Sequence, residues 1–195
     1  MSSLQAPEIP PDVLARARTG DIQAQEIIYR HLCKPVYTLI RRLVVRPAIA
    51  EELLQDVFVE ILRSLPQYSA AGSFLGWVRS IAMTKALMYL RSPWHRGLSL
   101  LGLERGTMLP EPPAAENSGA LGADLESALA ALPAVSRAVV WLHDVEGLTH
   151  AEIARLFRRT TSFSKSQLAR AHAQLRERLE VKSGDVACTP ISKHC

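Results

Sequence analysis

Cysteine is scarce in this chain, and Cys33, Cys188 and Cys195 show no C-x-x-C spacing. An odd set without paired spacing argues against a disulfide framework and is typical of a reducing cytoplasm. No apolar run approaches the ~20 residues of a membrane span, and the N-terminus MSSLQAPEIPPD is acidic and broken by proline rather than signal-like. We therefore expect a cytoplasmic protein with no membrane insertion.

Aromatic residues make up only 6% of the chain, and long β-branched runs are missing, which argues against an all-β fold. The 48% of hydrophobic and 22% of charged residues are typical of a globular protein rather than a disordered one. A chain of 195 residues can bury one ordinary core or two small ones. The composition therefore favours an all-α fold of two small helical domains.

Catalytic motifs are also missing. The six histidines are scattered, and no H-E-x-x-H, G-x-S-x-G or glycine-rich phosphate loop accompanies them. Asp144 and Glu146 flank a predicted helix end and are interpreted as surface charges. The tail residues Cys188, His194 and Cys195 offer too few ligands for a closed tetrahedral metal site, so we expect a frayed tail. The sequence thus predicts no enzyme, no cofactor and no metal.

Helical periodicity dominates residues 12–91. Apolar residues recur at helical spacing from Asp21 to Val45, and again in a second helix from about Ile49 to Ser64. Pro66 ends that second helix, PQYSAAGS is typical of a loop, and Ser73 can cap a third helix. These features predict one helical module after an N-terminal tail of residues 1–11.

The helical periodicity of apolar residues ends before residues 92–123. This segment is rich in proline, glycine and small residues and is predicted to form a flexible linker. A second helical module is predicted over residues 124–182, followed by a tail of residues 183–195. Its expected helices run from Asp124 to Leu132, from Pro133 to Asp144, from Thr149 to Phe157 and from Phe163 to Glu180. Thr149 and Glu152 have the spacing of a capping box.

A short capped helix, a tight turn and a longer helix form the layout of a helix-turn-helix, whose second helix enters the DNA major groove. Projection of the last helix puts Leu168, Ala171 and Leu175 on the core side and polar residues opposite. Arginine can read guanine there, and glutamine can read adenine. With a net charge of +4 and a pI near 9.2, we expect these DNA-contacting residues: Arg158, Arg159, Lys165, Ser166, Gln167, Arg170 and Gln174.

A family resemblance sharpens this interpretation. The second module resembles region 4 of the extracytoplasmic-function (ECF) sigma factors, which are group IV of the sigma-70 family. The resemblance is carried by LPAVSRAVVWLHDVEGLTHAEIARLF and SKSQLARAHAQLRERL. In that family, region 4 binds the promoter −35 element. The first module resembles region 2 of the same family through GDIQAQEIIYRHLCKPVYTLIRRLV, AEELLQDVFVEIL and GSFLGWVRSIA. The resemblance implies a sigma factor that carries RNA polymerase to promoters without covalent chemistry.

By the same resemblance, the second helix faces the β and β′ subunits of the polymerase core through Glu51, Glu52, Gln55 and Asp56. Ile49 stands where many members carry an acidic residue, and some branches use a threonine phosphorylated by a Ser/Thr kinase instead. We expect Glu51 to supply a carboxylate at the N-terminal turn of this helix and to tune polymerase affinity. An anti-sigma factor is a further expected partner.

The loop PQYSAAGS and the following helix resemble the part of region 2 that engages the −10 element and holds the melted strand. The expected −10 residues are Tyr68, Trp77, Arg79, Lys85 and Arg91. Aromatic rings can stack on extruded bases, and cations can hold phosphates. Tyr68, in the loop, is the better stacking candidate, whereas core packing competes for Trp77 and Phe74.

Some positions depart from the family pattern. Ser162, Phe163 and Ser164 stand where a Gly-Thr-Val-type sequence usually opens the recognition helix, and Phe163 either packs or touches a thymine methyl group. Met83 and Thr84 stand where Arg-Asn is common, so no −10 sequence preference carries over. Two other classes stay open: a stand-alone helix-turn-helix regulator that acts without polymerase, and a helical adaptor that binds only protein.

Overall fold

The computed structural model describes residues 8–69, 72–92 and 120–185, and within these ranges it contains helices and no strand. The elements are α1 (Pro11–Arg18), α2 (Ile22–Leu43), α3 (Pro47–Ser64), the short 3₁₀ turn η1 (Leu65–Gln67), α4 (Phe74–Arg91), α6 (Ala120–Ala130), α7 (Ala134–Val140), the π-helical segment η2 (Trp141–Val145), α8 (His150–Phe157) and α9 (Thr161–Asp185). The predicted all-α fold is confirmed. Predictions for residues 93–119 and for the Cys188, His194 and Cys195 tail lie outside the described residues.

The first module, formed by α1 to α4, is built around the long helix α2. This helix contacts α1, α3 and α4, and it continues through Pro35 although proline removes one backbone donor. Its buried stripe repeats at three- and four-residue spacing and includes Ile28, Leu32, Val36 and Leu39. The apolar face predicted from periodicity is therefore the face on which the other three helices pack.

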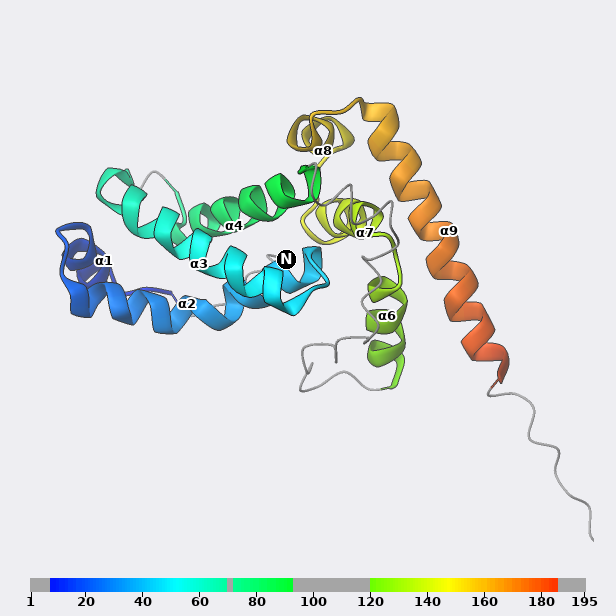
Figure 1. Ribbon diagram of the computed structural model, residues 1–195, viewed down its shortest axis with the longest axis horizontal. Coiled ribbons are helices and arrows are strands. Elements are labelled where there is room, and N and C mark those ends of the chain that lie inside the picture. Colours follow the sequence, from blue (N-terminus) through cyan, green and yellow to red (C-terminus); the bar gives the residue numbers. More distant parts are fainter. Residues whose placement is uncertain (1–7, 70–71, 93–119, 186–195) are drawn as a thin grey trace, which may run out of the picture.

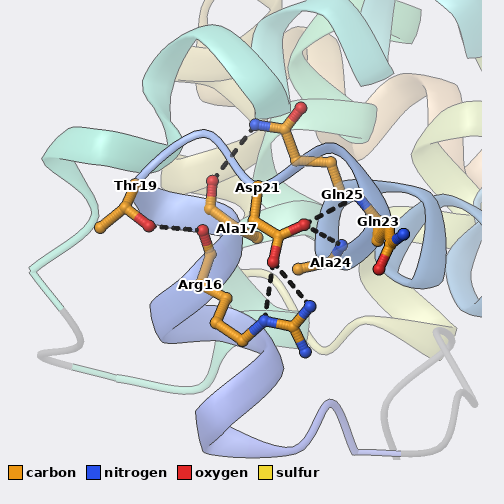
Figure 2. A network of polar contacts seen from close by, with 7 residues as sticks. All are labelled: Arg16, Ala17, Thr19, Asp21, Gln23, Ala24 and Gln25. Carbon is orange, nitrogen blue, oxygen red and sulfur yellow. Dashed lines mark hydrogen bonds and ion pairs between the residues drawn. The ribbon is translucent and has the colours of Figure 1, made fainter.

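A polar network fixes the corner between α1 and α2, as Figure 2 shows. Asp21 caps α2: its Oδ1 accepts from the backbone N–H groups of Gln23 at 2.9 Å and Ala24 at 3.2 Å. The other oxygen of Asp21 accepts from Arg16 Nε at 2.7 Å and lies 2.6 Å from Arg16 Nη2. Gln25 closes the corner by donating its side-chain amide to the Ala17 carbonyl at 3.2 Å.

Removal of the Asp21 carboxylate should destabilise this corner in a pH-dependent way. The side-chain hydrogen bond from Arg16, followed by the backbone hydrogen bond from Ala24, holds the pKa of Asp21 below its usual value. A depressed folded pKa means that the stabilisation is present above the unfolded pKa and is lost as pH falls through the folded one. We expect Asp21→Ala to lower the urea midpoint at pH 7 and to match wild type at acid pH, as followed by circular dichroism.

Glu26→Ala is the matched control, because Glu26 makes an exposed ion pair with Arg30 one turn away on α2. Exposed pairs of this kind contribute little to stability. The interpretation of the corner is wrong if Glu26→Ala lowers the midpoint as much as Asp21→Ala does, or if the Asp21→Ala deficit persists unchanged at acid pH.

Several helix boundaries differ from those expected. Proline fits the first position of a helix, so α3 begins at Pro47 rather than Ile49. Pro133 instead precedes the first residue of α7, as its N-cap. Residues 120–123, expected in the linker, belong to α6. The last helix begins at Thr161 rather than Phe163, because the Thr160 hydroxyl accepts from the Phe163 N–H at 3.3 Å and caps it.

The second module, formed by α6 to α9, ends in a helix much longer than its partners. α7 turns into the π-helical segment η2, so the regular α-helix ends at Val140 rather than continuing to Asp144. Helix α9 contacts α6, α7 and α8 and then extends beyond them, as Figure 1 shows at the right of the view. None of the helices in the described ranges is long and apolar enough to cross a membrane.

The two modules touch each other, which the sequence did not predict. Helix α2 contacts α7, α4 contacts α8, and Figure 1 shows α7 and α8 between the first module and α9. Buried residues of both modules form one continuous apolar cluster, in which Leu43 and Val44 belong to the first module and Val139 and Leu142 to the second. The structure is therefore a docked pair of modules rather than two separate clusters.

Candidate nucleic-acid and partner interfaces

Helix α8 opens with the predicted capping box, which is confirmed. The Thr149 hydroxyl accepts from the Glu152 N–H at 3.3 Å, and the Glu152 carboxylate accepts from the Thr149 N–H at 2.8 Å. The Thr149 hydroxyl also donates to that carboxylate at 2.7 Å. These bonds satisfy the backbone donors that begin the helix, and they fix where α8 starts relative to η2.

The turn between α8 and α9 is made by Arg158, which has a left-handed backbone at φ 51°. Its N–H donates to the Arg155 carbonyl at 3.1 Å, and the next N–H, of Arg159, donates to the Ala154 carbonyl at 2.9 Å. A left-handed residue at this position ends a helix abruptly and turns the chain back. The side chains of Arg158 and Arg159 are both exposed beside the start of α9.

Helix α9 presents the expected two faces. Leu168 and Ala171 are buried against the second module, whereas Lys165, Ser166, Arg170 and Gln174 are exposed. Gln167 lies at the edge of the polar face, half-buried, and its carbonyl oxygen accepts from the buried Ser136 hydroxyl at 2.7 Å. An exposed polar face near the N-terminus of the second helix is the surface with which a helix-turn-helix reads base edges.

Ser164 and Phe163, where the chain departs from the family pattern, both serve packing. Ser164 is fully buried, and its hydroxyl lies 3.0 Å from His150 Nδ1. The ring of Phe163 lies 5.9 Å from that of Phe157, while the Arg159 guanidinium lies 6.0 Å from the Phe163 ring. The structure thus gives a hydrogen-bond partner to the small polar residue that the sequence puts on the buried face of α9.

Asp144 links η2 to α9. Its two oxygens lie 2.7 Å from His143 Nδ1 and 2.7 Å from His172 Nε2 on α9. Partial burial acts to raise the pKa of Asp144, but the hydrogen bonds and charges of His143 and His172 hold it below its usual value. In the described part of the chain, no group of three or more His, Cys, Asp or Glu side chains is arranged to hold a metal ion.

The residues expected to face polymerase gather on α3. Glu51, Glu52, Gln55 and Asp56 are all exposed on this helix, whereas Leu53 and Val57 face the core. One expectation about Glu51 is wrong: the first turn of α3 contains no acidic residue, because the helix starts at Pro47 and puts Glu51 in the second turn. The helix dipole therefore favours this carboxylate less than expected.

Tyr68, expected in an open loop, is instead packed at the end of η1. The residue is only 8% exposed, its hydroxyl donates to the Gly72 carbonyl at 2.6 Å, and its ring centroid lies 5.4 Å from that of Phe74 and 5.0 Å from that of Trp77. The reason is the mutual packing of these three rings. Beside them lies a shallow pocket of about 440 Å³ lined by Gln67, Tyr68, Ser69, Gly72, Ser73, Gly76 and Trp77.

The cations expected to hold the −10 strand are engaged within the protein. Arg79 Nη1 lies 2.7 Å from Glu146 Oε2, and Arg91 Nη1 donates to the Leu156 carbonyl at 2.7 Å, both across the module boundary. Lys85 Nζ lies 3.5 Å from Glu60 Oε2 within the first module. Glu146, interpreted from the sequence as a surface charge, has a fully buried side chain, and no local sequence signal indicates its partner 67 residues away.

Comparison with known proteins agrees with this layout. Residues 28–96 match the family model of sigma-70 region 2, and residues 123–175 match that of sigma-70 region 4. The ECF RNA polymerase sigma factor SigE of Mycolicibacterium smegmatis is 32% identical over 176 residues, which cover 87% of this chain and 68% of that protein. The RNA polymerase sigma factor CarQ of Myxococcus xanthus is 29% identical over 167 residues, which cover 85% of this chain and 95% of CarQ.

Among solved structures, the sigma factor RpoE of Bartonella quintana, in complex with the anti-sigma factor NepR, superposes with a TM-score of 0.52. It is 21% identical, and the match covers 76% of this chain and 92% of RpoE, so it supports the fold. The order of the two matched regions along the chain is the same as the order of the two helical modules. The chain belongs to the ECF sigma factors of the sigma-70 family, which are transcription initiation factors of RNA polymerase.

Proposed function

We propose that this protein directs core RNA polymerase to specific promoters by reading the −35 element with α9 and by holding the melted −10 element with the first module. The observation that carries the proposal is the exposed face of α9, which displays Lys165, Ser166, Arg170 and Gln174 beside the arginine-rich turn. Arginine and glutamine side chains read base edges, and the flanking cations bind phosphates.

For the −10 element, the aromatic group beside the pocket supports the proposal. An extruded base could enter the pocket of about 440 Å³ and stack on Trp77, which is partly exposed. Tyr68 would act mainly by shaping the pocket wall, because its ring is buried against its neighbours. Arg79, Lys85 and Arg91 on α4 would hold the strand's phosphates once their present partners are released.

For polymerase, the exposed acidic face of α3 supports docking on a basic surface of the β and β′ subunits. Complementary charge steers association and fixes orientation. Restraint by an anti-sigma factor is supported by the related RpoE fold, which is in complex with one. A Ser/Thr kinase acting on this chain is the alternative form of restraint.

The direct test is association of the purified chain with core polymerase, followed by run-off transcription on a fragment library. The proposed function predicts that the mixture initiates at a defined set of promoters and that the chain alone binds duplex DNA weakly. A stand-alone regulator would bind duplex DNA by itself and would not change initiation by the core. An adaptor that binds only protein would give no salt-sensitive DNA affinity in any mixture.

Glu51 provides a graded test of the polymerase surface. Because Glu51 is exposed in the second turn of α3, we expect Glu51→Ala to weaken core binding by roughly threefold, the small effect typical of one exposed charge. Glu51→Thr should weaken it equally and should recover affinity if a kinase phosphorylates the threonine. Fluorescence titration of core with labelled chain measures both, and unchanged affinity in both variants would reject a tuning role for Glu51.

A further inference from the structure

Gln167 lies where the polar face of α9 meets α7. It is half-buried, whereas Arg170 and Gln174, three and seven residues farther along α9, are exposed. Residues at these spacings share one side of a helix. Because α7 packs against α9, Gln167 combines a place on the polar face with a contact to the interior of the second module.

Ser136 on α7 holds one end of the Gln167 amide. Ser136 is only 6% exposed, and its hydroxyl donates to Gln167 Oε1 at 2.7 Å. Its neighbours along α7 are buried as well, among them Ala138 and Val139. A buried hydroxyl that loses its partner is unfavourable, because water does not replace the lost hydrogen bond. We therefore expect the Gln167 oxygen to stay on Ser136 when α9 meets DNA.

Helix α9 is held on both sides of Gln167. Three residues earlier, Ser164 is fully buried, and its hydroxyl lies 3.0 Å from His150 Nδ1 on α8. Five residues later, His172 Nε2 lies 2.7 Å from Asp144 Oδ2 on η2. These contacts fix the rotation of α9 about its axis, so the Gln167 oxygen stays within reach of α7.

The contact with Ser136 decides which hydrogen-bonding groups Gln167 can offer to DNA. An unrestrained glutamine reads adenine with both ends of its amide: the oxygen accepts from N6, and the nitrogen donates to N7. Since the oxygen of Gln167 is turned toward Ser136, the NH₂ group is the end that remains for DNA, and this group has donors and no acceptor. The major-groove edge of guanine offers two neighbouring acceptors, N7 and O6.

We propose that Ser136 is a positioning residue that makes Gln167 a donor-only contact for guanine in the −35 element, in place of the adenine that an unrestrained glutamine would select. The inference rests on the proposed function, because it takes α9 as the helix that enters the major groove. It gives a serine buried beside α9 a role in promoter specificity. Gln174 is exposed about two turns farther along, so both ends of its amide stay open to adenine.

The test measures base preference in the holoenzyme. The chain is mixed with core polymerase and a promoter library in which the −35 element is randomised and each promoter carries a transcribed barcode. Gln167→Ala identifies the base pair that Gln167 reads, because preference should be lost at that position and kept at the others. There we expect wild type to favour a G·C pair over an A·T pair by roughly tenfold, within the range for one specific base contact.

Two variants then test the donor-only contact itself. Gln167→Glu keeps an oxygen for Ser136 but turns an acceptor toward DNA, so the preferred orientation of the G·C pair should reverse, because glutamate accepts from cytosine N4. Ser136→Ala releases the amide, so an A·T pair should become at least as favoured as G·C. The negative charge of the glutamate lowers yield on every promoter, but it does not change the ratio between base pairs at one position.

Ser164→Ala is the matched control, because it also removes a buried hydroxyl, but one whose partner is His150 rather than Gln167. It should keep the wild-type ratio even where overall yield falls. A purely structural role for Ser136 predicts instead that Ser136→Ala and Ser164→Ala lower yield alike and leave the ratio unchanged. Circular dichroism identifies the folded variants, and Gln167→Glu provides the test if Ser136→Ala does not fold.

The inference is overturned if Gln167→Ala changes no position or if wild type favours an A·T pair at the position that it identifies. It is also overturned if Gln167→Glu keeps the wild-type orientation or if folded Ser136→Ala keeps the wild-type ratio. Any of these results together with −35-dependent initiation by wild type rejects only the donor-only contact. Wild-type initiation that does not depend on the −35 sequence rejects the proposed role of α9, and with it the role of Gln167.

Discussion

Arg170→Ala is expected to reduce run-off transcription from a −35-dependent promoter by roughly 10- to 100-fold, the factor for one bidentate contact with a guanine. Arg170 is exposed on the face of α9 opposite Leu168 and Ala171, which are buried in the second module. The variant should retain core binding, because the proposed polymerase surface lies on α3. The measurement is run-off yield on a promoter selected from the fragment library, compared with the same promoter carrying a substituted −35 element.

Two variants on the same helix make this result specific. Arg170→Lys keeps the charge but loses the planar fork, so it should bind DNA with relaxed preference at one base pair. Arg176→Ala removes an exposed arginine about 9 Å farther along α9, beyond the N-terminal part that we propose enters the groove. Equal losses for Arg170→Ala and Arg176→Ala would contradict base reading by Arg170 and would indicate only a general charge effect.

Charge reversal on α3 is expected to give the second large effect. Glu52 and Asp56 lie four residues apart and are both exposed, so they share one helical face. Glu52→Lys and Asp56→Lys should each weaken core binding by roughly tenfold or more, because a lysine would then oppose a basic partner surface. Titration of core polymerase with labelled chain at two salt concentrations measures the loss, which should shrink at high salt.

The matched control for these reversals is Glu26→Lys on α2, which makes the same charge change at another exposed site. It should leave core affinity within about twofold of wild type, because surface charges outside a contact contribute little. Loss of core binding in Glu26→Lys as well would show that net charge, rather than the α3 face, governs association. Wild-type affinity in Glu52→Lys and Asp56→Lys would exclude this face as the docking surface.

The sequence was most informative where structure is determined locally. The caps at Ser73 and Thr149 and the buried stripe of α2 follow from side chains within a few residues of one another, so helix positions were predicted closely. Because glycine and small residues predominate in them, residues 120–123 were predicted to belong to the linker, but they are helical in the structure.

The differences at the candidate site come from contacts between distant residues. Tyr68 was predicted to be accessible for stacking on a base because its sequence neighbours are typical of a loop. In the structure, Phe74 and Trp77 on the next helix pack against its ring. Glu146 looked like a surface charge, and only the docking of α4 buries it. Hydrophobic periodicity reports which face of a helix is buried, but it contains no information on which partner covers a polar group.

At Arg158, whose φ is positive, the residue that best fits the backbone of the turn differs from the residue that best binds DNA. A left-handed backbone costs a non-glycine residue about 1–2 kcal/mol, whereas glycine adopts it freely. A variant optimised only for thermal stability would therefore carry glycine there and would lose a cation beside α9, the helix proposed to enter the major groove. Engineering this sigma factor for robustness and engineering it for tight promoter binding would thus lead to opposite choices at residue 158.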